Sequence, residues 1–208
     1  MKLNVASILR RSAVNGPGER YVIWTQGCPL ACPGCWNPDT WAFERRNLWA
    51  VNDLLADIAS TDYIDGVTFT GGEPFAQAST LAELAAGVKK LGLSVVVFTG
   101  YELRELASPE ARRLLDQTDI LVCGRFVEAE RALDLRWRGS RNQTVHVLGL
   151  VPELDLGPTL PTCEVHLDGN GVATLTGFPP DEFRARGSTG SWPMPDQPDR
   201  EIQARDGQ

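Results

Sequence analysis

The chain has 208 residues, a hydrophobic content of 42% and a formal net charge of −7 at pH 7. This length and balance fit about one globular domain with additional segments, and they exclude a wholly disordered chain, a coiled coil and a collagen-like fibre. The acidic balance argues against general binding to nucleic acid or to an anionic membrane. No stretch reaches the ~18 apolar residues of a membrane helix, and Met1–Arg11 has no leader-like pattern, so we expect a cytoplasmic protein.

Short apolar strands alternate with helical segments through most of the chain. The expected strands are Arg20–Thr25, Asp65–Thr70, Leu93–Thr99, Asp119–Cys123 and Thr144–Leu150. The expected helices are Asn52–Ser60 with Asn52 as its N-cap, Ser79–Leu91 stopped by Gly92, and Glu102–Gln117 broken near Pro109. This alternation indicates βαβ units and a parallel sheet.

We therefore expect an α/β fold, in which residues 1–150 form an open, partial (βα) barrel of about five βα units. In folds of this kind, functional residues lie at the carboxyl ends of the strands. Three candidate segments fall there: the cysteines after Thr25, the Gly71-Gly72-Glu73 segment and the Thr99-Gly100-Tyr101 segment.

The C-terminal part of the chain has a different pattern. Cys163–Asp168 and Val172–Thr176 read as short strands around Gly169-Asn170-Gly171, which is a hairpin signal. We expect a hairpin extension within residues 151–178. The remainder, residues 179–208, is polar and broken by Pro and Gly, and we expect a disordered tail there.

Three of the five cysteines stand close together, at Cys28, Cys32 and Cys35, with C-x3-C-x2-C spacing. Thiolates are the ligands of iron–sulfur clusters, and three on one loop can bind three irons of a 4Fe-4S cluster and leave the fourth open to a substrate. The Gly and Pro residues of Gly27–Trp41, the segment we call the cysteine loop, suit a tight fold whose backbone amides donate to sulfur.

Two other interpretations of these cysteines stay open. The thiols can be structural, with no metal bound. They can also form a zinc site, which needs a fourth ligand. The candidates for that ligand are Cys123, Cys163, His146 and His166, and none has finger-like spacing.

Several segments together carry a resemblance to a known family. They are VNGPGER at Val14–Arg20, the cysteine loop running into NPDTW, TGGEPF at Thr70–Phe75, FTGYELREL at Phe98–Leu106, ILVCGRFVE at Ile120–Glu128 and LRWRGSRNQ at Leu135–Gln143. With them the chain resembles the radical S-adenosylmethionine activating enzymes. More narrowly, it is similar to the activating proteins of anaerobic ribonucleoside-triphosphate reductase, which are relatives of pyruvate formate-lyase activating enzyme.

The resemblance implies two cofactors, a 4Fe-4S cluster on Cys28, Cys32 and Cys35 and S-adenosylmethionine. Reductive cleavage of S-adenosylmethionine would give a 5′-deoxyadenosyl radical that abstracts a hydrogen from a glycine of a partner enzyme. The family pattern assigns S-adenosylmethionine contacts to Gly34, Cys35, Trp36, Gly72, Glu73, Thr99 and Gly100. It implies a glycyl-radical enzyme as partner and flavodoxin or ferredoxin as electron donor.

The chain departs from the family at Cys123, where the family usually has Asp, and in the extra length after Leu148. We interpret Cys123 as a small apolar filler of the strand end, with a reactive thiol as the alternative. The GGEP segment alone also fits a plain tight turn. Two further functions stay open: a radical enzyme acting on a peptide or small metabolite, and a non-enzymatic iron–sulfur electron carrier.

Overall fold

The computed structural model describes residues 1–149, 163–167, 169 and 173–179, and these form a seven-stranded sheet and a separate two-stranded hairpin. The strands of the sheet are β1 (Lys2–Ser12), β2 (Arg20–Thr25), β3 (Asn47–Ala50), β4 (Gly66–Gly71), β5 (Ser94–Thr99), β6 (Ile120–Cys123) and β7 (Thr144–Val147). The hairpin consists of β8 (Cys163–Leu167) and β9 (Ala173–Gly177). The α/β class and the C-terminal hairpin are therefore as predicted.

The sheet is mixed, with strand order β3-β1-β2-β4-β5-β6-β7. Its four central strands, β2, β4, β5 and β6, run parallel, whereas β1, β3 and β7 pair antiparallel at the two sides. The expectation of about five βα units is wrong. The predicted strand Thr144–Leu150 corresponds to β7, which is antiparallel to β6. The parallel strand pairs are therefore only three: β2–β4, β4–β5 and β5–β6. The result is an open sheet with β3 and β7 at its edges.

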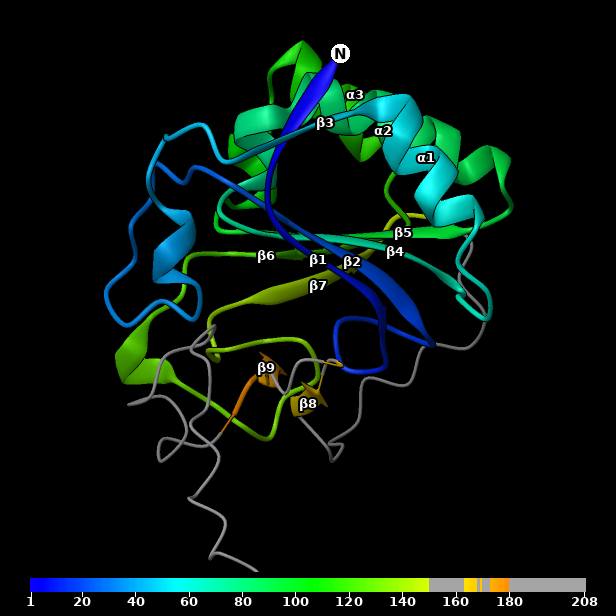
Figure 1. The fold of residues 1–208 in the computed structure, drawn as a ribbon. Helices are drawn as coiled ribbons and strands as arrows, with labels where there is room; N and C mark the ends of the chain where they lie inside the picture. The colour runs from blue at the N-terminus through cyan, green and yellow to red at the C-terminus, as the bar shows by residue number, and fades with distance from the viewer. Residues whose placement is uncertain (150–162, 168, 170–172, 180–208) are drawn as a thin grey trace, which may run out of the picture.

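Three α-helices cover one face of this sheet (Figure 1). They are α1 (Val51–Ala59), α2 (Ala78–Lys90) and α3 (Pro109–Leu115). Short 3-10 turns lie between the elements: η1 (Pro38–Thr40), η2 (Pro74–Gln77), η3 (Leu103–Glu105) and η4 (Glu128–Glu130).

The predicted helix ends were partly wrong. Helix α1 begins after Ala50 without a side-chain cap, so Asn52 lies inside the helix rather than at its N-cap. The predicted break near Pro109 within Glu102–Gln117 is confirmed, because Ser108 caps a new helix whose first residue is Pro109. The piece before the break is only the 3-10 turn η3, and α3 ends at Leu115. Gly92 does follow α2, with a left-handed φ of 78° that favours glycine.

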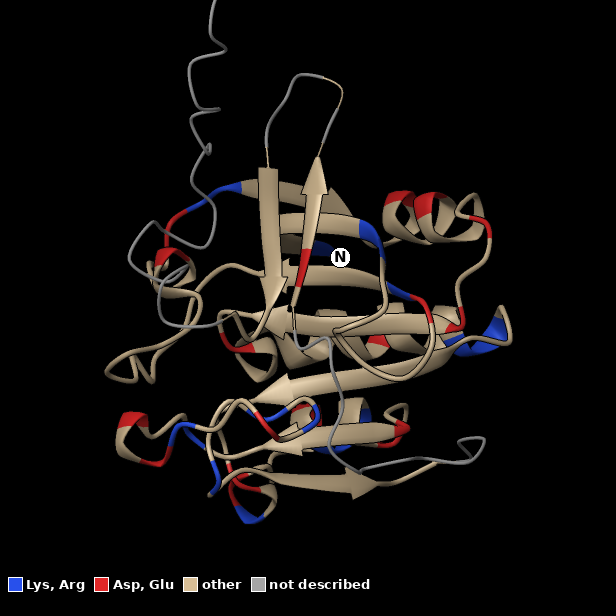
Figure 2. Cartoon of the chain, turned by 90° about the horizontal axis from the view of Figure 1, so that it is seen from below, with Lys and Arg blue, Asp and Glu red and all other residues tan. Residues whose placement is uncertain are grey.

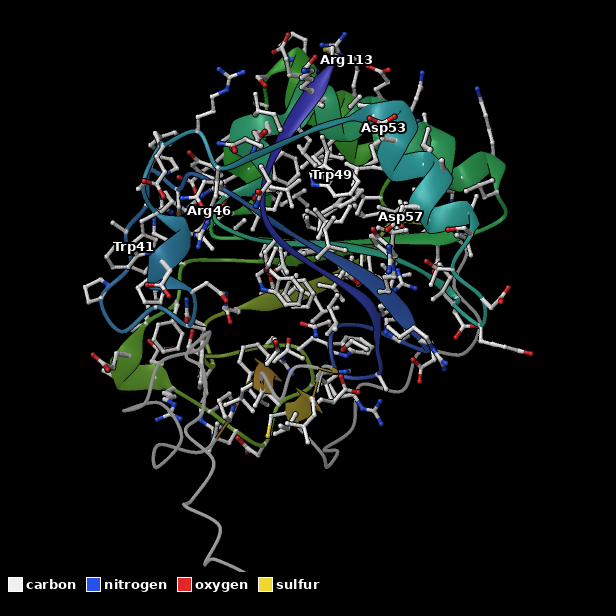
Figure 3. All side chains as sticks on the ribbon, in the orientation of Figure 1. Trp41, Arg46, Trp49, Asp53, Asp57 and Arg113 are labelled. Atoms are coloured by element: carbon white, nitrogen blue, oxygen red, sulfur yellow. The ribbon has the colours of Figure 1, made fainter. Side chains whose placement is uncertain are left out.

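The main core lies between the helices and the sheet. Its fully buried side chains include Leu54, Leu81 and Leu84 from the helices and Phe69 from β4. Trp49 packs against this core from β3, as Figure 3 shows. A second, smaller core lies on the other face of the sheet and contains Val96, Ile120, Val122 and Trp137. Strand β5 therefore contributes to both faces, which explains its continuous apolar sequence.

Arg20 holds together the amino ends of three parallel strands. Its side chain has 0% exposure and donates to Val67 O at 2.7 Å, to Ser94 Oγ at 2.7 Å and to Thr68 Oγ1 at 3.2 Å. Burial lowers the pKa of Arg20 to about 10. The Arg of the VNGPGER segment is thus structural, at the end of the sheet opposite the predicted site.

The hairpin β8–β9 lies on the face of the sheet opposite the helices (Figure 1), and its strands run across those of the sheet (Figure 2). The predicted turn at Gly169-Asn170-Gly171 lies mostly outside the described residues, as does nearly all of the predicted tail. Among the helices of the described residues, none combines the length and the apolar character that a membrane crossing requires.

Candidate active site

A cavity of about 270 Å³ opens at the carboxyl ends of the parallel strands, between the sheet, the cysteine loop and the hairpin. The predicted site residues that line it are Cys28, Cys32, Cys35, Trp36, Gly72, Glu73, Thr99 and Gly100. Gly34 lies in the same loop but not on the cavity wall. The structure therefore brings together residues that lie up to 72 positions apart, from Cys28 to Gly100, as their positions after parallel strands predict.

Other lining residues were not among the predicted site residues. Among them are Val14, Asn15, Trp137 and Gln143, together with Leu175–Pro179 from β9 and the residues that follow it. The first four belong to the VNGPGER and LRWRGSRNQ segments, so the motif resemblance already contained the signal for them. No feature of the hairpin sequence marked it as part of a site.

The cysteine loop folds back on its own end. Gly27 N donates to Thr40 O at 2.8 Å, and Cys28 N donates to Trp41 O at 3.0 Å. Gly27 itself has φ of 99°, a left-handed conformation in which a side chain is strained. These two hydrogen bonds close the loop, and the three cysteines lie on the short segment that the loop contains.

Backbone N–H groups act on all three cysteine sulfur atoms. Cys35 Sγ accepts a hydrogen bond from Asn37 N at 3.4 Å. The backbone of Leu30 and Ala31 lowers the pKa of Cys28, and that of Phe126 lowers the pKa of Cys32. Such donors favour thiolate over thiol and are a means by which proteins stabilise iron–sulfur clusters.

Burial acts in the opposite direction and raises the pKa of both Cys28 and Cys32. These two thiols therefore favour the protonated form until a metal binds and replaces the proton. The loop thus offers three half-buried sulfur ligands whose charge a metal cluster would neutralise. These residues fit an iron–sulfur cluster.

The same geometry gives no support to the zinc interpretation. None of Cys123, Cys163, His146 and His166 lines the cavity. Within the part of the chain that the structure describes, no three His, Cys, Asp or Glu side chains converge closely enough to hold one metal ion. A four-iron cluster has a different requirement, since each of its thiolates binds a separate iron.

The Gly71-Gly72-Glu73 segment is joined directly to the start of the cysteine loop. Gly72 N donates to Thr25 O at 2.8 Å, and Glu73 N donates to Gly27 O at 2.9 Å. A Cβ atom on Gly72 would lie 2.5 Å from Gly27 O, so only glycine permits this approach. The segment is a tight turn, and the turn also holds the loop against the end of β4.

Glu73 is the buried acid of the site, with only 1% of its surface exposed. Its Oε1 accepts from Phe75 N at 2.9 Å and from Thr99 Oγ1 at 2.8 Å, and its Oε2 accepts from Gly100 N at 2.9 Å. Burial raises the pKa of Glu73 to about 7, although these three donors oppose the shift. Thr99 and Gly100 therefore line the site as hydrogen-bond donors to Glu73. One lone pair of the Glu73 carboxylate is left for a cation.

Trp36 lies in an aromatic cluster with Phe126 and Phe178. Its ring meets Phe178 edge-on with centroids 5.2 Å apart and meets Phe126 edge-on at 5.9 Å. The guanidinium of Arg131 lies 4.8 Å from the centre of the Trp36 ring. The ring thus forms a fixed apolar wall of the cavity beside Cys35.

Cys123 and Arg125 lie just behind the site. Cys123 is 2% exposed, belongs to the helix-side core and lies 3.3 Å from Thr144 Oγ1. This placement agrees with the interpretation of Cys123 as an apolar filler, and its neighbours Val122 and Gly124 line the cavity instead. Arg125 pairs with Glu105 at 2.9 Å, and its positive charge favours the ionised forms of Cys32 and Glu73.

Comparisons with known proteins agree with this arrangement. The family model for a 4Fe-4S single cluster domain matches residues 14–146. The anaerobic ribonucleoside-triphosphate reductase-activating protein of Haemophilus influenzae is 31% identical over 154 residues, which are 69% of this chain and 97% of that protein. The protein of the same name from Escherichia coli K12 is 33% identical over 144 residues, which are 65% of this chain and 92% of that protein.

Among solved structures, QueE from Escherichia coli is similar, with a TM-score of 0.41 and 20% identity over 57% of this chain and 69% of that chain. The family model covers more than half of the chain, and the Haemophilus relative aligns over nearly its whole length. The chain therefore belongs to the family of anaerobic ribonucleoside-triphosphate reductase-activating proteins, which is built on the 4Fe-4S single cluster domain.

Proposed function

We propose that the chain is a radical S-adenosylmethionine enzyme that generates a glycyl radical in a partner enzyme, an anaerobic ribonucleoside-triphosphate reductase. One observation carries this proposal. Three cysteine thiols share a cavity with the buried Glu73, and the backbone of Gly72-Glu73 is hydrogen-bonded to the start of the cysteine loop. The family names supply the identity of the partner.

Cys28, Cys32 and Cys35 would hold three irons of a 4Fe-4S cluster and leave the fourth for S-adenosylmethionine. When bound and reduced, the cluster supplies the electron that cleaves S-adenosylmethionine to methionine and a 5′-deoxyadenosyl radical. The protein's own task is to hold the reactants in place and to exclude water.

Glu73 suits the ammonium group of the methionyl part, because a carboxylate with a free lone pair in a buried site attracts a cation strongly. Thr99 and Gly100 orient that carboxylate through their hydrogen bonds. We assign the adenosyl end to the Gly34-Cys35-Trp36 segment, where the indole ring offers a flat apolar surface for a base.

The open sheet fits a partial barrel that admits a protein loop carrying the target glycine. From the family resemblance we infer that flavodoxin or ferredoxin donates the electron. The acidic net charge of −7 supports a protein partner rather than nucleic acid or a membrane surface.

The experiment that tests this function uses protein reconstituted without oxygen. The wild-type chain should hold about four irons and, with dithionite, convert S-adenosylmethionine to 5′-deoxyadenosine. Replacement of Cys28, Cys32 or Cys35 by Ala should remove the brown chromophore and the product. Cys163→Ala is the matched control, since Cys163 lies in the hairpin, and it should retain both. Equal iron content in the triple Ala variant would contradict the assignment.

A second candidate function is a radical enzyme that acts on a peptide or small metabolite. The contribution of the hairpin residues Leu175–Pro179 to the cavity wall favours it, because they alter the surface that a substrate meets. Both candidates share the cleavage of S-adenosylmethionine and differ only in the molecule that the radical attacks.

A further inference from the structure

The hairpin β8–β9 lies outside the segment that the family model matches, yet it is fastened to the site from two sides. On the first side it meets the N-terminal strand and its following loop. Glu164 accepts from Ser12 Oγ at 2.7 Å and from Ala13 N at 2.8 Å, and Thr176 Oγ1 accepts from Asn15 Nδ2 at 2.9 Å. Thr176 and Asn15 are both buried and both line the cavity.

On the second side, the end of the hairpin meets the cysteine loop. Phe178 packs edge-on against the Trp36 ring, which Phe126 contacts in the same manner. Arg131 lies over the Trp36 ring and donates from its Nη2 to Pro179 O at 3.1 Å. One arginine thus joins the extension to the indole.

The backbone of the loop after β6 fills the centre of this aromatic cluster. A Cβ atom on Gly139 would lie 2.5 Å from Trp36 Nε1, 3.1 Å from Phe178 and 3.2 Å from Phe126. The three rings therefore surround Gly139 closely, and a shift of Phe178 would release the Trp36 ring on one side. Trp36 therefore contacts a ring that comes from outside the matched family segment.

We propose that Phe178 is a positioning residue for the adenosine end of S-adenosylmethionine, and that β8–β9 forms the wall of the cavity on this side. Phe178 fixes the Trp36 ring, and the ring receives the base. The proposal rests on the proposed function, because it assigns the adenosine end to Trp36. It gives the C-terminal extension a role in cofactor affinity.

The test compares Phe178→Ala with Leu167→Ala in the reconstituted full chain. Leu167 is the matched control, because it lies on the same hairpin with 69% of its surface exposed. Titration of the oxidised protein with S-adenosylmethionine should show a Kd about three- to tenfold higher for Phe178→Ala. Leu167→Ala should bind like wild type, and all three proteins should hold equal iron.

Two further readouts separate positioning from general stability. The KM for S-adenosylmethionine should rise in Phe178→Ala while kcat for 5′-deoxyadenosine formation stays constant, because the lost contact acts equally on ground and transition states. Phe178→Tyr keeps the ring and should restore the wild-type Kd. Without S-adenosylmethionine, hydrogen exchange of the amides of residues 34–37 should be faster in Phe178→Ala only.

An unchanged Kd in Phe178→Ala would overturn the proposal, and so would loss of iron in that variant, which would mean that Phe178 supports the whole loop. Phe178→Leu keeps the apolar bulk and serves as the control for a folding defect in Phe178→Ala. It should unfold at the wild-type urea concentration and still bind more weakly. Failure of the wild-type chain to bind S-adenosylmethionine would instead overturn the proposed function, while the exchange measurement still reports on hairpin docking.

Discussion

At the scale of single residues, Glu73 has the most unusual environment in the site. It is a carboxyl group with a pKa near 7, and this value exceeds the ordinary value of 4.5 because the group is buried. In the folded chain the neutral form is therefore favoured up to about pH 7. A bound ammonium group would reverse this preference, because it stabilises the carboxylate.

This pKa predicts a particular pH dependence of stability in the metal-free chain. Because the folded-state pKa lies above the unfolded value, the contribution of Glu73 to stability is complete below about pH 4.5 and is lost as the pH rises to about 7. Glu73→Gln does not titrate. Its free energy of unfolding relative to wild type should therefore rise by up to about 3 kcal/mol between pH 5 and pH 8.

Urea denaturation of both proteins at several pH values measures this difference, and titrations elsewhere in the chain cancel in the comparison. Stability curves that run parallel for wild type and Glu73→Gln would mean that Glu73 ionises normally in the folded state.

The close packing of Gly72 against Gly27 leads to a second prediction at this scale. The approach of Gly72 to Gly27 O leaves no room for a methyl group, so Gly72→Ala should push the cysteine loop away from β4. We expect a loss of about 1–3 kcal/mol in the free energy of unfolding. Lower iron content after reconstitution should accompany it. Gly169→Ala is the control, since no atom of the described residues lies within 4 Å of a Cβ there. Equal stability of the two variants would contradict the close contact.

Cys123 shows how a family comparison and a structure can differ about one position. Restoration of the family residue, Asp, at a side chain that is 2% exposed would bury a carboxylate in the helix-side core. We expect Cys123→Asp to lower the urea midpoint and Cys123→Ala to lower it far less, with iron content and S-adenosylmethionine cleavage kept in Cys123→Ala. Loss of substrate turnover in Cys123→Ala with cleavage intact would indicate a catalytic thiol.

At the scale of the elements, buried or partly buried polar side chains link the strands and helices to one another. Asp57 of α1, labelled in Figure 3, pairs with Arg10 at 2.7 Å and accepts from the hydroxyl of Tyr21, so it attaches the first helix to β1 and β2. Arg20 performs the same task for β2, β4 and β5 from a fully buried position.

We therefore expect Arg20→Met to reduce the free energy of unfolding by about 3 kcal/mol or more, because the carbonyls of Val67 and Ser94 lose a charged donor in a buried place. Arg113→Ala is the control. It removes an exposed pair with Glu110, which contributes about 0–1 kcal/mol. Urea denaturation measures both, and a small effect at Arg20 would contradict its role as the link between strands.

The parallel strands and long helices were predictable, because each buries a continuous or periodic apolar pattern. Strand Arg20–Thr25 was predicted with the observed bounds. The antiparallel strands β1 and β3 were missed. Strand β1 mixes apolar and charged side chains, and β3 has only four residues. The pairing of these strands also depends on partners that are distant in the sequence. The antiparallel direction of β7 was also not predictable, because hydrophobic periodicity does not indicate the direction in which a strand pairs.

At the scale of the whole molecule, helices cover one face of the sheet and the hairpin covers part of the other (Figure 1). Charged residues lie mostly in the helices, the connecting loops and the strand ends, whereas the central parts of most strands carry none (Figure 2). The cavity lies at the boundary of these layers. Its three cysteines and its buried glutamate were predictable as site residues because they follow parallel strands. Its hairpin wall was not, since docking of Glu164 and Phe178 depends on partners more than 100 residues away.

The most direct test of the proposed function is electron paramagnetic resonance of the partner. The reconstituted chain, S-adenosylmethionine and a reductant are mixed without oxygen with the anaerobic ribonucleoside-triphosphate reductase of the same organism. The account predicts the doublet signal of a glycyl radical, with 5′-deoxyadenosine formed in proportion, and neither with Cys35→Ala. Formation of 5′-deoxyadenosine without any radical on the reductase would contradict the proposed partner and favour a peptide or small-metabolite substrate.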